Sequence, residues 1–351
     1  MPISPLSSLD PTRFETAPIL KTLAKASRAL AELKGVAGTI PNQGILINTL
    51  TLQEAEVSSE IENIVTTQDN LFQGDASPNA RLDPSTKEVL HYREALAIGF
   101  QSVRESSLLT NSQILEIQAC LEKNRAGFRR VPGTSLKDPA GNVVYTPPQS
   151  ATEIEALMGD LEKFIHQDTE LDPLIRMALV HHQFESIHPF YDGNGRTGRI
   201  INVLFLVKEG LLNIPVLYLS RAILETKSEY YRLLQAVRGD DCWEEWIIYL
   251  LEAVALSSQA TITTIKAIHH ALLQTKHQVR KQFRFYSQDL INLLFTHPYT
   301  KISFLQDQLK ISRVTATKYL ESLTDAKILE KRKIGRSNYY LNHALIGALT
   351  R

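Results

Sequence analysis

The sequence predicts a mainly α-helical protein, with one small β-hairpin inside a helical core and a separate winged-helix unit at the C-terminus. Apolar residues recur at alternating steps of four and three along most of the chain, which is the period of an amphipathic helix. Strand patterns are few, and the composition shifts after about Gln278. The 351 residues allow two or three domains, and the hydrophobic fraction of 43% is ordinary for a globular protein.

Helices are predicted in order along the first part of the chain. The first shows its apolar face in residues Ile19, Leu23, Ala26, Leu30 and Leu33. The others cover residues 52–64, 84–105, 112–123, 151–165, 171–184, 197–209, 225–237 and 243–272. We expect the polar run at residues 66–69 to follow the end of the second helix.

A β-hairpin is predicted between residues 128 and 148. Its first strand is residues 128–131, its turn is the Asp, Pro, Gly and Asn-containing run 138–142, and its second strand is residues 143–146. Pro147 and Pro148 then end the strand, because proline cannot donate a ladder hydrogen bond.

The C-terminal unit is predicted to follow a basic junction at residues 279–285. Helices are expected over residues 288–295 and 302–309, with Ser303 as N-cap of the second, and a third helix begins after Ser312 and runs to Leu323. Strands 328–334 and 338–341 follow, and this order is that of a winged helix-turn-helix. The predicted domains are residues 1–105, 106–277 and 278–351.

Charge and cysteine content exclude several classes of protein. Lys and Arg total 38 and Asp and Glu total 38, so the net charge indicates no partner. Cys120 and Cys242 lack the spacing of a metal site, and so few thiols favour a reducing compartment over a disulfide framework. The first residues lack the pattern of a signal peptide, and no uncharged stretch reaches membrane-spanning length. We therefore expect a cytoplasmic protein that does not contact a membrane.

The segment from His188 to Arg199 has the residues that chemistry at a nucleotide phosphate needs. Gly193 and Gly195 let a ligand approach the backbone, and their amides can cradle an anion at the start of the next helix. Arg196 and Arg199 lie three apart on that helix and can face one phosphate group.

The same segment supplies a metal ligand and a base. Asp192 offers a hard oxygen suited to Mg²⁺, and His188 could take a proton from an attacking hydroxyl. A histidine before a proline, or one Gly-Asn-Gly, is by itself most often an ordinary turn. A structural turn has no need of two arginines, an acid and a histidine within twelve positions, and a Walker A loop is excluded because no Gly-Lys-Ser/Thr follows.

This segment resembles the signature of the Fic family, His-Pro-Phe-x-Asp/Glu-Gly-Asn-Gly-Arg-x-x-Arg, and fills every fixed position. The similarity extends over roughly residues 10–270. It implies a protein adenylyltransferase, in which His188 deprotonates a Ser, Thr or Tyr hydroxyl of a target protein, or of the enzyme itself, and AMP is transferred from ATP. It also implies that Asp192 binds Mg²⁺. The ATP-binding residues that it implies are Gly193, Asn194, Gly195, Arg196, Thr197 and Arg199.

A second motif lies in the helix predicted at residues 52–64. Ser58 and Glu62 are four apart and share a face, which in isolation indicates only a solvated helix surface. Beside the signature, Ser58, Glu62 and Asn63 resemble the inhibitory motif of the class of Fic proteins whose inhibitory helix lies N-terminal to the core. By that resemblance Glu62 pairs with Arg199 and inhibits the enzyme. The same Glu could instead align a water that removes AMP.

Two further regions resemble parts of Fic proteins. Residues 128–148 are similar to the flap that holds a target segment by strand addition, although an ordinary surface hairpin has the same pattern. Tyr230, Tyr231 and Leu234 are similar to the segment beside adenine, although each could equally be a core residue of a helix. Arg238 stands where some relatives have Asn. Family resemblance also implies a homodimer.

The C-terminal unit carries an excess of cations that favours phosphate contacts. Its candidate DNA-contacting residues are Arg313, Lys318, Lys333 and Arg336, and a protein-docking module with a basic face is the alternative. For the whole chain, the alternatives to an adenylyltransferase are a DNA-binding regulator with a nucleotide-sensing Fic core, an AMP-removing Fic enzyme, and a Fic enzyme that uses another nucleotide donor.

Overall fold

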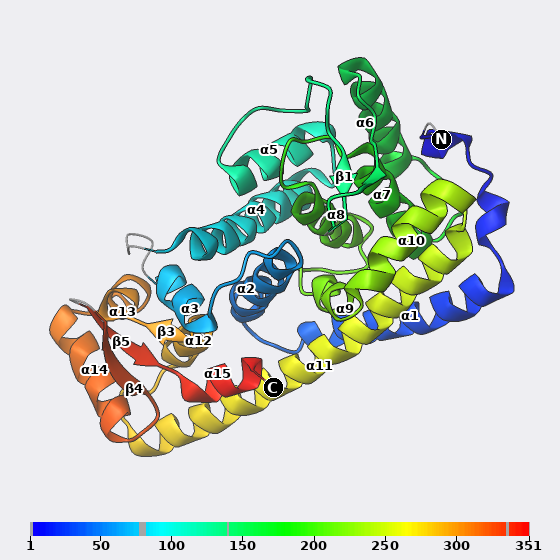
Figure 1. Cartoon of the computed structure of the whole chain (residues 1–351). Coiled ribbons are helices and arrows are strands. Elements are labelled where there is room, and N and C mark those ends of the chain that lie inside the picture. The colour runs from blue at the N-terminus through cyan, green and yellow to red at the C-terminus, as the bar shows by residue number, and fades with distance from the viewer. Residues whose placement is uncertain (1–2, 77–81, 139, 335–336, 351) are drawn as a thin grey trace.

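The computed structural model describes residues 3–76, 82–138, 140–334 and 337–350, and helices dominate these ranges (Figure 1). After two short 3₁₀ turns, the first part contains α1 (Ala17–Ala37), α2 (Gln43–Ile61), α3 (Gln68–Ala76), α4 (Pro84–Ser106) and α5 (Asn111–Glu122). The core continues with α6 (Ala151–His166), α7 (Pro173–Ile187), α8 (Asn194–Lys208), α9 (Leu219–Glu225), α10 (Lys227–Asp240) and α11 (Trp243–Gln282). The prediction of a mainly helical fold is confirmed.

Helices α7 and α8 form the centre of the molecule. Every residue of α7 from Leu174 to Ile187 is buried, and so are nearly all residues of α8 up to Leu206. They pack on each other, and α4, α6 and α11 surround them. The loop between α7 and α8 is therefore joined at both ends to helices that have no freedom to move independently of the core.

Helix α11 runs the length of the molecule and leads into the C-terminal unit (Figure 1). The predicted junction at residues 279–285 is wrong in its first part, because the helix continues to Gln282. Arg280 and Lys281 occupy its last turn, where cations interact favourably with the helix dipole. By length and composition alone α11 could cross a membrane, but half of its most apolar window is buried, as in a core helix.

Helix α2 differs from its prediction at both ends. It begins at Gln43, where the Asn42 side chain accepts a hydrogen bond from the Gly44 amide, and it ends at Ile61. Glu62 is the C-cap and Asn63 has a left-handed φ of 63°, so both lie just beyond the helix that was predicted to contain them. Asparagine adopts this conformation at low cost, which is why the helix stops here.

The hairpin is displaced from its prediction. Strand β1 (Leu136–Lys137) pairs antiparallel with β2 (Val143–Tyr145), whereas residues 128–131 form no strand. Instead, the Arg129 amide donates to the carbonyl of Pro189, which fixes this segment to the loop after α7. Part of the predicted turn, Pro139, lies outside the described residues.

The C-terminal unit contains α12 (Gln288–Thr296), β3 (Tyr299–Thr300), α13 (Ile302–Leu309), α14 (Arg313–Asp325), β4 (Glu330–Ile334), β5 (Ser337–Leu341) and α15 (His343–Leu349). Its sheet is antiparallel with the order β3-β5-β4. Ser312 caps α14 as predicted, but Lys301 rather than Ser303 stands at the N-cap of α13. β3 and α15 were not predicted. The winged-helix assignment stays a prediction, and Arg336 lies outside the described residues.

The C-terminal unit packs on α2 and α3 (Figure 1). Arg332 of β4 forms an ion pair with Asp69 at 3.1 Å, and the Tyr299 hydroxyl donates to the same carboxylate. The Gln53 side chain donates to the Leu349 carbonyl at 2.6 Å. Helix α2, which carries Ser58 and ends just before Glu62, and helix α3, which follows, are thus both in contact with this unit.

Candidate active site

The loop between α7 and α8 places His188 at the end of a buried helix. His188 is the C-cap of α7 with a left-handed φ of 49°, and its amide donates to the Phe184 carbonyl at 2.9 Å. A left-handed residue with a β-carbon is uncommon and turns the chain sharply. Gly193 is the N-cap of α8 and also has a positive φ, 76°, which glycine adopts without strain.

Asn194 holds this loop closed. Its side-chain oxygen accepts from the Phe190 amide at 2.8 Å, and its side-chain nitrogen donates to the Phe190 carbonyl at 2.9 Å. The side chain is buried and its hydrogen bonds are made within the loop, so only the backbone amide of Asn194 is available for a phosphate.

A cavity of about 410 Å³ lies over the loop and brings together most of the predicted residues. Its lining residues are Glu62, Ile64, Glu88, His188, Tyr191, Asp192, Gly193, Asn194, Gly195 and Arg196. Thr197 and Arg199 do not line it, because both are fully buried behind it in α8. A base, a carboxylate and a glycine-rich helix start therefore share one cavity.

His188 lies in surroundings that keep its imidazole neutral. Burial lowers its pKa to about 4, and the nearby charges of Arg238 and Arg129 act in the same direction. A neutral imidazole has a free lone pair and can accept a proton, which a protonated imidazolium cannot.

We expect the imidazole of His188 to titrate far below the ordinary histidine pKa of about 6.5. Following the imidazole resonances by NMR from pH 7 to pH 4, with His188→Ala for assignment, should show a neutral ring throughout most of this range. A midpoint near 6.5 would contradict the electrostatic description of this site.

Arg199 is bound on one side by the end of α2. Its guanidinium donates to the Glu62 carboxylate at 2.8 Å, to the Ser58 hydroxyl at 2.8 Å and to the Ser58 carbonyl at 2.8 Å. Burial acts to raise the pKa of Glu62, but the charge and hydrogen bonding of Arg199 outweigh it and hold this pKa below its ordinary value. The Glu62–Arg199 pair expected from the sequence is present. Asn63, the next residue after Glu62, forms the left-handed turn that follows the end of α2.

Arg196 is bound by two carboxylates that sequence reasoning missed. Its guanidinium donates to Glu122 at 2.9 Å and to Glu88 at 3.3 Å, while its own side chain is almost fully buried. Burial raises the pKa of Glu122, and Arg196 opposes that rise. Both glutamates lie on helices distant in sequence, α4 and α5, so no motif marks them.

Asp192 is exposed at the edge of the cavity. One of its carboxylate oxygens accepts from the Gly193 amide at 2.7 Å, which orients the side chain. Among the described residues, no group of three or more His, Cys, Asp or Glu could hold a metal ion. One carboxylate beside a phosphate cradle nevertheless fits Mg²⁺, which is commonly bound by one or two carboxylates together with substrate phosphates.

The three residues expected beside adenine do not line this cavity. Tyr230 is buried, with its hydroxyl hydrogen-bonded to His181 at 2.8 Å, and Leu234 is buried as well. Tyr231 is 43% exposed. Their contact with adenine stays a prediction.

Three protein-family models match successive parts of the chain. "Fic/DOC family N-terminal" matches residues 20–101, "Fic/DOC family" matches residues 108–206, and "Protein adenylyltransferase SoFic-like, C-terminal domain" matches residues 272–345. The chain belongs to the Fic family.

Curated relatives of this Fic protein are named protein adenylyltransferases. Fic-1 of Caenorhabditis elegans is 28% identical over 158 residues, which cover 42% of this chain and 29% of the relative. A probable protein adenylyltransferase of Aquifex aeolicus is 28% identical over 174 residues, covering 48% and 51% respectively. Fic of Drosophila ananassae is 24% identical over 243 residues, covering 67% and 43%. The chain thus spans about half or less of the length of these relatives.

Solved structures share the Fic fold. A Fic family protein from Desulfovibrio desulfuricans G20 superposes with a TM-score of 0.59 at 19% identity, over 93% of this chain and 96% of that one. A fragment of Fic-1 from C. elegans gives a TM-score of 0.55 at 20% identity, over 72% and 74%.

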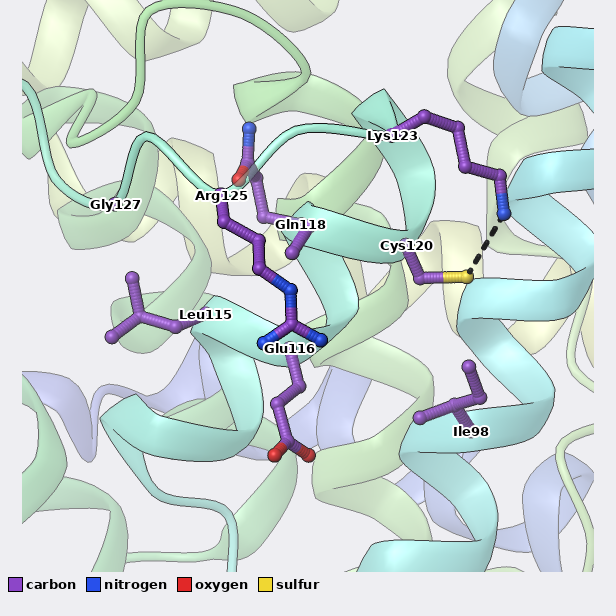
Figure 2. A pocket seen from close by; sticks show the side chains of 9 residues that line it. Ile98, Leu115, Glu116, Gln118, Cys120, Lys123, Arg125 and Gly127 are labelled. Carbon is purple, nitrogen blue, oxygen red and sulfur yellow. Dashed lines mark hydrogen bonds between the residues drawn. The ribbon is translucent and has the colours of Figure 1, made fainter.

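A second cavity, of about 560 Å³, lies beside the Fic loop, between α4, α5 and the segment after α5 (Figure 2). None of the signature residues lines it. Figure 2 shows the Lys123 ammonium close to the Cys120 sulfur at one end, with a separation of 3.8 Å. Gln118 connects the two sites, because its side chain donates to the Asp192 carbonyl at 3.4 Å.

Proposed function

We propose that this Fic protein is a protein adenylyltransferase that transfers AMP from ATP to a hydroxyl side chain of target proteins and of itself. The observation that carries the proposal is that His188, Asp192, Gly193 and Gly195 line one cavity at the start of α8. The names of the curated relatives support the same activity.

Each group has a role in the proposed reaction. The hydroxyl oxygen attacks the α-phosphorus, the bond to the bridging oxygen breaks, pyrophosphate leaves, and the proton passes to the neutral His188 imidazole. The α8 amides would stabilise negative charge on the phosphates. A magnesium ion held by Asp192 would neutralise further phosphate charge. Arg196, which lines the cavity, and Arg199, which is buried behind it, would be the cations for the outer phosphates.

Autoinhibition by Glu62 is part of the proposal. The Arg199 guanidinium donates to the Glu62 carboxylate where an ATP phosphate oxygen would otherwise accept. ATP would then bind with Arg199 held by Glu62 and with its α-phosphate misplaced relative to His188. Removal of AMP by the same site stays an alternative.

Target docking on the flap is also proposed. The β1–β2 hairpin exposes Val143 and Val144, 56% and 45% accessible, and the preceding segment exposes Val131 at 64%. Exposed apolar side chains on a short hairpin suit a partner segment that adds as a strand.

We infer for the C-terminal unit that its exposed cations contact nucleic-acid phosphates. Arg313 and Lys318 are exposed on α14, and Lys333 is exposed on β4. A cytoplasmic location and a homodimer also stay predictions.

The activity is tested with ATP labelled on the α- or the γ-phosphate, using the Glu62→Gly form alone and with cell lysate. The proposal requires that α-label, but not γ-label, becomes covalently bound to protein. Transfer of the γ-label would indicate a kinase, and transfer of neither label to any protein would overturn the proposal.

A further inference from the structure

The last turn of α7 is held by the side chains of three residues, two from the hairpin segment and one from α10. An α-helix leaves its final carbonyls without partners inside the helix, and here these belong to the residues just before His188 and to His188 itself. Arg238 donates to the Glu185 carbonyl at 3.1 Å, and the Tyr145 hydroxyl donates to the Ser186 carbonyl at 3.0 Å.

Arg129 completes this set. Its guanidinium donates to the Ile187 carbonyl at 3.2 Å and to the His188 carbonyl at 2.7 Å, and also to the Pro148 carbonyl. The residue is 1% exposed. All four free carbonyls at the end of α7 are therefore occupied, two of them by a single buried arginine.

The three donors also support one another. The guanidinium of Arg238 lies 4.0 Å from the centre of the Tyr145 ring, a cation–π contact, and donates to the Ser186 hydroxyl at 2.9 Å. Arg129 and Tyr145 lie at the two ends of the hairpin segment, whereas Arg238 lies on α10. The contacts thus join the flap, α10 and the end of α7 into one rigid unit.

We propose that Arg129, Tyr145 and Arg238 are positioning residues for the catalytic base, and that they tie the orientation of His188 to the flap on which a target docks. The proposal rests on the proposed function, since it assigns His188 as the base. His188 has a left-handed backbone, which persists only when its surroundings fix it. The arginines have a second effect, because after burial their charges are the next cause of the low pKa of His188.

The test compares Arg238→Met and Arg129→Met with wild type, each in the Glu62→Gly background. NMR titration should show the pKa of the His188 imidazole rising by about one pH unit when either cation is removed. AMP transfer should lose about tenfold to a hundredfold in kcat, since small displacements of a catalytic group are costly, while KM for ATP changes little.

Arg176→Met is the matched control. Arg176 is also buried and also caps a helix, donating to the carbonyls of Phe164 and Ile165 at the end of α6. The Arg176→Met variant should have a lower melting temperature, with the pKa of His188 and the kcat of AMP transfer unchanged. The proposal would be overturned if Arg176→Met changed the pKa of His188 and kcat as much as the other two variants do. It would also be overturned if Arg129→Met and Arg238→Met folded and changed neither quantity.

Tyr145→Phe provides a test that does not require loss of a buried charge. It keeps the ring beneath Arg238 and removes only the hydrogen bond to the Ser186 carbonyl, so kcat should fall with KM for ATP unchanged. Unchanged kcat would count against the proposal. The NMR measurement is independent of AMP transfer, so a shifted pKa in an inactive protein would overturn the proposed function while supporting this inference.

Discussion

His188→Ala is expected to reduce AMP transfer by about a thousandfold or more when it is combined with Glu62→Gly. General-base catalysis by a positioned side chain contributes roughly 10² to 10⁴ in rate. The imidazole is the one titratable nitrogen base that lines the cavity, among the residues that the structure describes. The measurement is incorporation of α-labelled AMP into the protein over time.

His166→Ala is the control for this change. His166 lies in α6, where its ring is hydrogen-bonded to the Leu109 carbonyl at 3.1 Å, and it does not line the cavity. In the Glu62→Gly background, this variant should transfer AMP at the same rate as Glu62→Gly alone. If His188→Ala in this background were as active as Glu62→Gly alone, the proposal that the imidazole is the catalytic base would be wrong.

Glu62→Gly is expected to increase automodification by about tenfold to a hundredfold. A hydrogen bond to a charged group contributes about 1.5–3 kcal/mol, and losing the one from Arg199 to Glu62 frees the guanidinium for a phosphate. Ser58 would still hold the other side of Arg199, so the cation should stay in place. The initial rate of AMP incorporation at saturating ATP measures the effect.

Glu60→Gly separates the loss of this carboxylate from the effect of glycine on the helix. Glu60 is exposed in the last turn of α2, so the substitution introduces the same backbone freedom close to the same helix end. It should leave the rate unchanged. Equal rates of automodification for Glu62→Gly and the wild-type protein would remove autoinhibition from the proposed function.

The sequence predicted those parts of the site that are contiguous in the chain. His188 and residues 191–196 line one cavity because a single tight loop carries them. The Glu62–Arg199 pair could be predicted only through family resemblance, since nothing in the periodicity of residues 52–64 marks one glutamate among several.

The contacts that the sequence did not reveal are those between distant elements. Arg129, Glu88 and Glu122 reach the site from segments that show no motif, and their side chains were indistinguishable from surface charges. The start of α2 was missed because its apolar residues are buried on more than one side, which removes the amphipathic period. The first strand of the hairpin was predicted at residues 128–131, but the backbone and side chain of Arg129 donate hydrogen bonds to the end of α7 and the loop after it. These hydrogen bonds replace pairing with the second strand.

The packing of the C-terminal unit on α2 and α3 has a practical consequence for experiments with shortened chains. A chain that ends near Phe283 would lose the partners of Asp69 and Gln53 and would expose the apolar surface on which α12 rests. Helices α2 and α3, on either side of Glu62, would then keep their packing on the core and lose their contacts with the C-terminal unit. If Glu62 inhibits the enzyme as proposed, altered catalysis in such a fragment would reflect a less constrained Glu62 and would not by itself show the loss of a recognition module.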